Sequence, residues 1–251
     1  MIDLHTHVLA GVDDGAATIA ESLEMLADCV RSGVQAVAAT PHVRDDYPTT
    51  AAVMEHGVAT LRREAEAESI RLEILTGGEI SLDCLSTTPT AELRRFGLGG
   101  SSRYLLVEFP YYGWPLNLAD QLAALRSSGF RAVLAHPERN DEVQAAPARL
   151  EPLVESGVLI QLTAASIAGS LGRRCQATAL QLLELDLAHL VASDIHGPGT
   201  RAGLMAAIEQ LSDQPLAQWL MKDVPLAIVL DEAVPPPPPP PRRRRVLWRR
   251  R

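Results

Sequence analysis

The chain has 251 residues, of which 47% are hydrophobic, enough for one large α/β domain or two small ones with a substantial core. Its formal net charge is −8, but removing the seven arginines of residues 242–251 leaves −15 on the rest, which disfavours broad binding to nucleic acid. No apolar run approaches the roughly 20 residues that span a bilayer. No cleavable leader pattern precedes Asp3 either, so we expect a cytoplasmic protein.

Short apolar runs rich in β-forming residues recur along the chain, and each is followed by a segment long enough for a helix. This alternation predicts βα units around a parallel sheet or barrel. The predicted strands are 2–7, 35–42, 71–80, 104–109, 131–136, 158–163 and 189–196. The predicted helices are 18–32, 49–69, 116–128, 145–156, 176–185 and 201–211.

Residues that can bind metal ions lie at the C-terminal ends of nearly all these strands. Only the sixth strand, which ends at Thr163, offers no strong ligand. The C-terminal ends of parallel strands meet on one face of a barrel, and this face carries the chemistry. In the first strand the H-x-H spacing also directs both imidazoles to one side. The candidate ligands are His5, His7, His42, Glu79, Glu108, His136, Asp194 and His196.

The loop after the first strand adds one more carboxylate. Asp13 and Asp14 both lie there, and the residue types alone do not decide between a ligand and a turn or helix cap. Nine ligands indicate two or three ions, because one ion with open positions needs about three protein ligands. Imidazoles and carboxylates without thiolates favour manganese, iron or zinc. His56 and His189 lack such a context, and we interpret them as structural.

Two arginines, Arg139 and Arg201, follow the fifth and seventh predicted strands and favour a phosphate ligand, which guanidinium groups bind in bidentate fashion. We expect Arg139, Arg201 and His42 to act in catalysis, with a metal-activated water attacking phosphorus. A cysteine-based phosphatase is excluded, because none of the three cysteines has an arginine six residues later. The cysteines also form no C-x-x-C pair, and the chain has no P-loop motif.

These motifs together resemble the polymerase-and-histidinol-phosphatase (PHP) superfamily of metal-dependent phosphoesterases. Within it, G-V-D-D-G and H-P-E-R resemble the bacterial protein-tyrosine phosphatases linked to capsule and exopolysaccharide synthesis. The resemblance covers about residues 1–232. It depends on D-L-H-T-H at 3–7, G-V-D-D-G at 11–15, T-P-H at 40–42, G-E-I at 78–80, L-V-E-F at 106–109, A-H-P-E-R at 135–139 and A-S-D-I-H at 192–196.

The resemblance implies a distorted (β/α)₇ TIM-like barrel with a trinuclear, usually manganese-activated centre. It implies that Asp14, not Asp13, is the ligand, and that Arg139 and Arg201 bind phosphate. The implied substrates are the phosphotyrosine tails of tyrosine autokinases. The implied ligand sets are His5, His7, Glu79 and Asp194 for one ion, Glu79, Glu108 and His136 for a second, and Asp14, His42 and His196 for a third.

Composition changes abruptly near Ala233, where seven prolines precede the arginine-rich end. We predict a metallophosphatase domain over residues 1–233 and a disordered tail over 234–251. The arginines, with Val246, Leu247 and Trp248 among them, favour weak attachment to an anionic membrane surface near a membrane-bound kinase. Solvated disorder without a membrane role is the alternative.

The activity also has alternatives at this level. A small-molecule phosphatase, such as one for histidinol phosphate, would use the same fold and metals. A non-catalytic regulatory module would keep the metal site only as a remnant, but the complete ligand set disfavours it. Tyr111, Tyr112 and Trp114 follow Glu108 and could hold a phenyl ring or simply anchor the loop.

Overall fold

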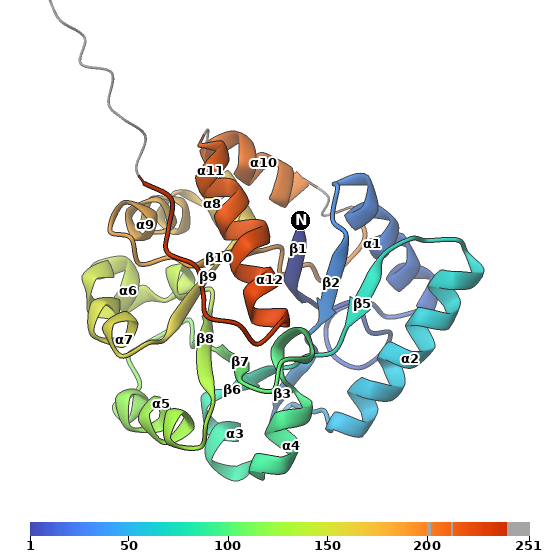
Figure 1. Ribbon diagram of the computed structural model, residues 1–251, viewed down its shortest axis with the longest axis horizontal. Coiled ribbons are helices and arrows are strands. Elements are labelled where there is room, and N and C mark those ends of the chain that lie inside the picture. Colours follow the sequence, from blue (N-terminus) through green and yellow to red (C-terminus); the bar gives the residue numbers. More distant parts are fainter. Residues whose placement is uncertain (200–201, 212, 240–251) are drawn as a thin grey trace, which may run out of the picture.

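In the computed structural model, which describes residues 1–199, 202–211 and 213–239, strands form a ring with helices outside it (Figure 1). Each of the seven predicted strand positions is occupied by at least one strand. The strands are β1 (Ile2–Thr6), β2 (Ala36–Ala39), β3 (His42–Arg44), β4 (Tyr47–Pro48), β5 (Glu73–Leu75), β6 (Glu79–Ser81), β7 (Tyr104–Glu108), β8 (Arg131–Ala135), β9 (Leu159–Thr163) and β10 (Leu190–Ala192).

Two sheets share this ring. One has the order β1-β2-β5 and the other β10-β9-β8-β7-β6-β3-β4, and every pair except β3 with β4 is parallel. An isolated bridge between Thr6 and Ile195 joins the first sheet to the chain just after β10, and the His7 N–H donates to the Ile195 carbonyl at 3.0 Å. The parallel strands therefore close into a distorted barrel, as predicted.

The distortion comes from two predicted strands that are each broken in two. The predicted strand 35–42 covers β2 and the first residue of β3, and the predicted strand 71–80 covers β5 and the first two residues of β6. Pro41 lies at the first break, has no N–H for a ladder, and accepts the Glu79 N–H with its carbonyl at 3.0 Å. At Gly78 an added Cβ would lie 2.6 Å from the Phe96 ring, so the second break needs glycine. Continuous strands were the wrong prediction at both places.

Most helices cover the outside of the ring, whereas the last helix lies across the ring (Figure 1). The two longest begin at side-chain caps, because Thr18 accepts the Glu21 N–H and Thr50 accepts the Val53 N–H. The helices are α1 (Ile19–Arg31), α2 (Ala51–Ala67), α3 (Leu82–Thr87), α4 (Thr90–Arg95), η1 (Leu98–Gly100), α5 (Leu118–Ser127), η2 (Pro137–Arg139), α6 (Asp141–Ala145), η3 (Pro147–Leu150), α7 (Glu151–Glu155), α8 (Ala164–Ala168), α9 (Arg173–Glu184), α10 (Ala202–Leu211), α11 (Gln214–Gln218), η4 (Trp219–Asp223) and α12 (Val224–Val229).

The predicted helices differ from these in two respects. The predicted helix over 145–156 is divided into η3 and α7, because Pro147 and Pro152 each sit in the first turn of a new helix. Helical segments at 82–95, 164–168 and 214–229 were not predicted. The last of these ends in α12, which packs against β1 and η1. Among the described residues, no helix is both long and apolar enough to cross a bilayer.

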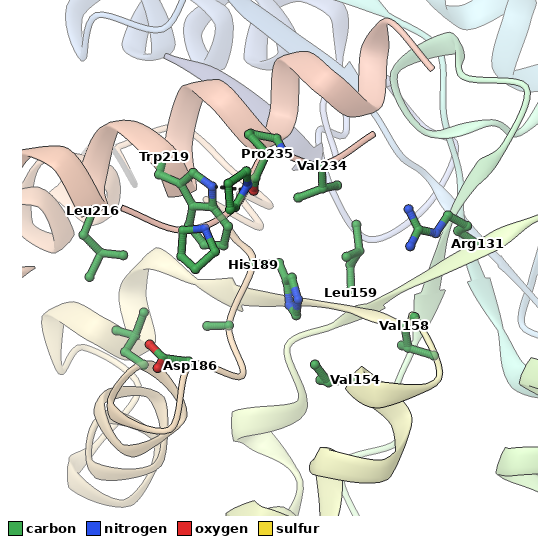
Figure 2. Close-up of a pocket in the computed structure, with 15 residues that line it drawn as sticks. Arg131, Val154, Val158, Leu159, Asp186, His189, Leu216, Trp219, Val234 and Pro235 are labelled. Carbon is green, nitrogen blue, oxygen red and sulfur yellow. Dashed lines mark hydrogen bonds between the residues drawn. The ribbon is translucent and has the colours of Figure 1, made fainter. Parts of the chain in front are cut away.

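The predicted domain boundary near residue 233 follows α12 by only a few residues. Val234 still packs against the hydrophobic core, and the Pro235 carbonyl accepts the Trp219 indole N–H at 3.0 Å (Figure 2). Contact with the barrel therefore continues into the segment that we predicted as tail. Residues 240–251 of that tail lie outside the described residues.

His189 is a structural histidine, as we interpreted it. It precedes β10, and its Nδ1 accepts the Ile160 N–H at 3.2 Å. Burial lowers the pKa of His189 from 6.5 to about 4. Between these two pH values the unfolded chain binds a proton at His189 that the folded chain does not bind. The contribution of His189 to the free energy of unfolding is therefore fully present above pH 6.5 and is lost as the pH falls towards 4.

We therefore expect His189→Asn to flatten the acid side of the stability curve. Between pH 6.5 and 4 the native chain should lose about 3 kcal/mol more free energy of unfolding than the variant, measured by urea titration at each pH. Parallel curves for the two proteins would contradict this role, and changes in the rest of the molecule cancel in the comparison.

Candidate metal centre

The structure brings all nine predicted ligands together at the C-terminal ends of the barrel strands. Four overlapping groups each place their potential ligand atoms within 4.8 Å of one another. These groups are His7, Asp14, His42 and His196; His5, Glu79 and His136; His5, His7 and Asp194; and His42, Glu79 and Glu108.

Glu79 lies at the centre of the cluster and is fully buried. One of its carboxylate oxygens, Oε2, is 3.3 Å from His5 Nε2 and 2.9 Å from His42 Nδ1. The other, Oε1, is 2.9 Å from His136 Nε2. With its two oxygens facing different imidazoles, this carboxylate is placed to bridge two cations.

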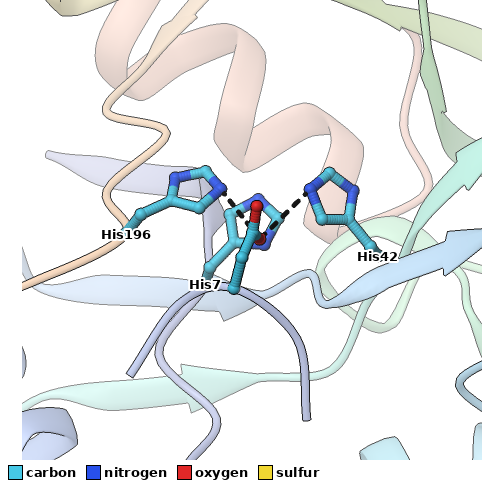
Figure 3. A group of neighbouring side chains, drawn as sticks. His7, His42 and His196 are labelled. Atoms are coloured by element: carbon cyan, nitrogen blue, oxygen red, sulfur yellow. Dashed lines mark ion pairs between the residues drawn. The ribbon is translucent and has the colours of Figure 1, made fainter. Parts of the chain in front are cut away.

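A second carboxylate, Asp14, faces the histidines at the mouth of the cluster. Its Oδ1 is 3.5 Å from both His42 Nε2 and His196 Nε2, and Figure 3 shows these imidazoles with His7 around one carboxylate. The side chain of Asp14 is 44% exposed, whereas that of His7 is fully buried. This group therefore lies at the open side of the site.

The groups differ in part from the sets that the family resemblance implied. His136 lies with His5 and Glu79, whereas Glu108 lies with His42 and Glu79. His7 also joins the group around Asp14. The nine clustered residues are the ones that the sequence predicts, whereas their role as ligands and their division among individual ions are proposals.

Two buried side chains orient the first pair of histidines. Gln161 Oε1 accepts from His5 Nδ1 at 2.8 Å, and Asp13 Oδ2 accepts from His7 Nδ1 at 2.7 Å. Each contact places the ring proton on Nδ1 and leaves Nε2 facing the cluster, which is how outer carboxylates and amides orient metal-binding imidazoles. Asp13 also accepts the His42 N–H at 3.0 Å. The geometry thus gives Asp13 an orienting position and Asp14 a ligand position.

The electrostatics of the cluster favour a bound cation. Burial lowers the pKa of His5, but Glu79 and Asp194 outweigh it and raise that pKa to about 9. Burial would raise the pKa of Glu79, but the charge of His5 and a hydrogen bond from His136 hold it well below the usual range. Protons on the imidazoles thus neutralise the carboxylates, which is the task that metal ions perform when histidines bind them in neutral form.

Unsatisfied buried atoms also fit a metal. Glu79 Oε2, His42 Nδ1 and His136 Nδ1 are buried without a hydrogen bond of acceptable geometry. Buried polar atoms are nearly always paired, so atoms left unpaired in a cluster of this kind point to a ligand. Divalent ions with imidazole and carboxylate ligands fit these residues.

A cavity of about 570 Å³ opens onto the cluster. Arg139 lines it, with Nη1 2.8 Å from Asp194 Oδ2 and its guanidinium 4.4 Å from the centre of the Tyr111 ring. Tyr111 also lines the cavity. Tyr112 is 81% exposed outside it, and Trp114 packs on Phe109. Arg201, the other predicted phosphate ligand, lies outside the described residues.

Sequence reasoning missed Arg44, Gln161 and Glu138. Arg44 lines the cavity and its Nη1 is 2.8 Å from Glu108 Oε1. Gln161 lies inside a predicted strand and not at its end, and its contact with His5 depends on its inward position on β9. Glu138 is fully buried and accepts the Thr163 N–H at 2.9 Å, which ties the segment after β8 to β9. Alternation along 158–163 could have indicated Gln161, but no pattern in the sequence identifies the other two.

This barrel with a histidine and carboxylate cluster at its strand ends defines a metal-dependent hydrolase class. The chain belongs to the capsular polysaccharide synthesis family CpsB/CapC, whose model matches residues 1–226. It is 37% identical to tyrosine-protein phosphatase YwqE of Bacillus subtilis over 202 residues, which are 80% of this chain and 79% of that protein. The family resemblance found in the sequence is thereby confirmed.

Solved structures agree on the fold. One match is to a structure described among crystal structures of YwqE from B. subtilis and CpsB from Streptococcus pneumoniae, unique metal-dependent tyrosine phosphatases. It has a TM-score of 0.82 and 31% identity, and the match covers 95% of this chain and 99% of that one. A lactonase from Listeria monocytogenes matches with a TM-score of 0.53 and 14% identity, over 93% of this chain and 92% of that one. At this identity the match shows a similar fold and nothing more. The predicted TIM-like barrel is confirmed.

The two aspartates of the first loop should behave differently. We expect Asp14→Ala to remove at least one ion per chain, because it deletes the carboxylate of its group. Asp13→Asn should keep the number of ions and weaken Mn²⁺ binding by about 10- to 100-fold, since it disturbs only the orientation of His7. Metal content after dialysis and a calorimetric Mn²⁺ titration separate the two effects. The opposite assignment, with the ion lost only in Asp13→Asn, would contradict this geometry.

Proposed function

We propose that this chain is a metal-dependent protein-tyrosine phosphatase. The observation that carries the proposal is the cavity in which Arg139 and Tyr111 face a buried cluster of nine histidine, aspartate and glutamate ligands. The names of its relatives support the same activity. The nine residues would hold two or three ions, with manganese as the activating metal and iron or zinc as alternatives.

The protein's own residues bind and orient the substrate. Arg139 faces the cavity and can donate to phosphate oxygens through the guanidinium nitrogens that do not contact Asp194. We assign the same role to Arg201 from the sequence. Tyr111 stacks against Arg139 and forms an aromatic wall next to the position where the phosphate would lie, which suits a phenyl ring. Divalent ions, when bound, would supply a Lewis acid and activate the attacking water.

A small-molecule phosphatase resembling histidinol phosphatase would use the same cluster, and it remains the second candidate. The exposed aromatic and aliphatic residues at the mouth, Tyr111 and Leu171, favour the aryl substrate, because neither offers a charge for a polar small molecule. A non-catalytic module is disfavoured by the complete set of ligands.

For the cellular setting, we infer that the substrate is the phosphotyrosine segment of a membrane-bound tyrosine autokinase that controls exopolysaccharide synthesis. The family description as capsular polysaccharide synthesis supports this setting. The chain would act in the cytoplasm, with a fraction held at the inner face of the membrane by the seven arginines of residues 242–251.

A hydrolysis assay tests the activity. With Mn²⁺ the chain should release phosphate from a phosphotyrosine peptide much faster than from histidinol phosphate, and a chelator should abolish the reaction. His42→Ala with Glu79→Ala should lower kcat by on the order of a thousandfold, because it removes groups shared by several ligand sets.

The matched control is Glu55→Ala with His56→Ala, which changes the same residue types on α2, outside the four ligand groups. This control should keep full activity. Activity that survives exhaustive chelation, or that the His42 and Glu79 double variant retains in full, would overturn the mechanism. Faster turnover of histidinol phosphate would favour the second candidate.

A further inference from the structure

The hairpin of β3 and β4 borders the metal cluster and is the one antiparallel pair among the strands that the structure describes. Arg44, the last residue of β3, pairs with Tyr47, and the two residues between them form the turn. Successive side chains of a strand alternate, so Arg44 extends to the same side of β3 as His42. Both residues line the cavity that opens onto the cluster.

Arg44 binds Glu108, the candidate ligand that ends β7. Its Nη1 donates to Glu108 Oε1 at 2.8 Å across β6, which lies between β3 and β7 in the sheet. The other carboxylate oxygen, Oε2, is 3.8 Å from His42 Nδ1, and Glu108 belongs to the ligand group of His42 and Glu79. The arginine thus holds one oxygen of Glu108 while the other oxygen faces the histidine.

The guanidinium of Arg44 is itself held by its own hairpin. Its Nε is 2.8 Å from Asp46 Oδ1 in the turn, and its Cζ lies 5.2 Å from the centre of the Tyr47 ring. The same ring stacks on His42, with the ring centres 5.8 Å apart. A long side chain loses conformational entropy when it is fixed, and contacts within the hairpin offset that loss before Glu108 is bound.

The charges of these three groups suit a cation nearby. Arg44 carries one positive charge, whereas Asp46 and Glu108 each carry a negative one. A guanidinium paired with Glu108 alone would cancel much of the attraction between this carboxylate and a divalent ion. Asp46 offsets the guanidinium charge, so Glu108 is held in place and the group as a whole stays negative. The side chain of Asp46 is 66% exposed, so water weakens its share of this effect.

We propose that Arg44 is a positioning residue for Glu108, and that the β3–β4 hairpin thereby sets the affinity of one ion of the cluster. That ion is the one held by the group of His42, Glu79 and Glu108. The inference rests on the metal centre proposed above and adds a residue outside its nine ligands. Residues that orient metal ligands through hydrogen bonds commonly change metal affinity by about 10- to 100-fold when they are substituted.

The test is a calorimetric Mn²⁺ titration of the full chain after its metal has been removed by chelation and dialysis. In Arg44→Met, which keeps an unbranched apolar side chain and removes the guanidinium, one ion should bind about 10- to 100-fold more weakly. The other ions should keep their affinity.

Two milder variants grade the effect. Arg44→Lys should restore part of the lost affinity, because an ammonium group can reach Glu108 but lacks the planar fork that contacts two carboxylates at once. Asp46→Asn should weaken the same ion by less than Arg44→Met does, since it leaves the contact with Glu108 intact and removes only a screened charge.

Arg95→Met is the matched control. Arg95 on α4 forms an ion pair of the same residue types with Glu55 on α2, in which Nη2 and Oε2 are 2.6 Å apart. Neither residue belongs to the four ligand groups, so every ion should keep its affinity in this variant. Urea unfolding of the metal-free proteins, measured in parallel, reports how much each ion pair contributes to the fold alone.

Unchanged Mn²⁺ affinity in the Arg44 variants that fold would overturn the proposal, whether or not their free energy of unfolding falls. In that case the ion pair only ties β3 to β7. A higher KM for a phosphotyrosine peptide with unchanged Mn²⁺ binding would also reject it and would assign Arg44 to the substrate. If the unsubstituted chain binds no Mn²⁺, the proposed metal centre itself fails, and this is seen before any variant is compared.

Discussion

The burial of Glu79 is the constraint on which the centre depends. A carboxylate without access to water is stable only if positive charge and hydrogen bonds surround it. Here imidazoles from three different segments supply that charge, namely His5 with His7, His42 and His136. Their contacts with one carboxylate couple strands that are far apart in the sequence. A bound cation would supply the same positive charge while each histidine stays neutral, which is the form in which imidazoles bind metal ions.

The barrel is distorted next to this carboxylate, where two predicted strands are broken. Because the strands break at Pro41 and at Gly77–Gly78, β3 and β6 start anew with His42 paired to Glu79 in parallel register. If both strands were continuous, His42 and Glu79 would belong to the sheet of β2 and β5 and not to the sheet of β3 and β6. Proline and glycine interrupt the two strands, and these interruptions position His42 and Glu79.

Features that depend on neighbouring residues could be predicted from the sequence, whereas features that depend on contacts between distant residues could not. The strand positions and eight of the nine clustered residues could be predicted, since alternation and strand-end placement are local patterns. The choice of Asp14 over Asp13 depends on the family resemblance. Arg44 could not be predicted, because its position depends on the short hairpin of β3 and β4 and on contact with Glu108, 64 residues later. Alternation along 158–163 could have indicated the inward position of Gln161, but not its contact with His5, which is 156 residues away. The short helices between 82 and 95 were missed because packing, not periodicity, forms helices of about six residues.

The carboxylates and imidazoles of the cluster lie at the C-terminal ends of the barrel strands. We propose that the nine residues at this end hold a cluster of ions joined through Glu79. The most direct test is a crystal structure of the Mn²⁺-loaded chain with anomalous diffraction at the manganese edge. We expect two or three peaks inside the cluster, with Glu79 oxygens bound to two of them. Peaks elsewhere, or a Glu79 that contacts none, would contradict this assignment.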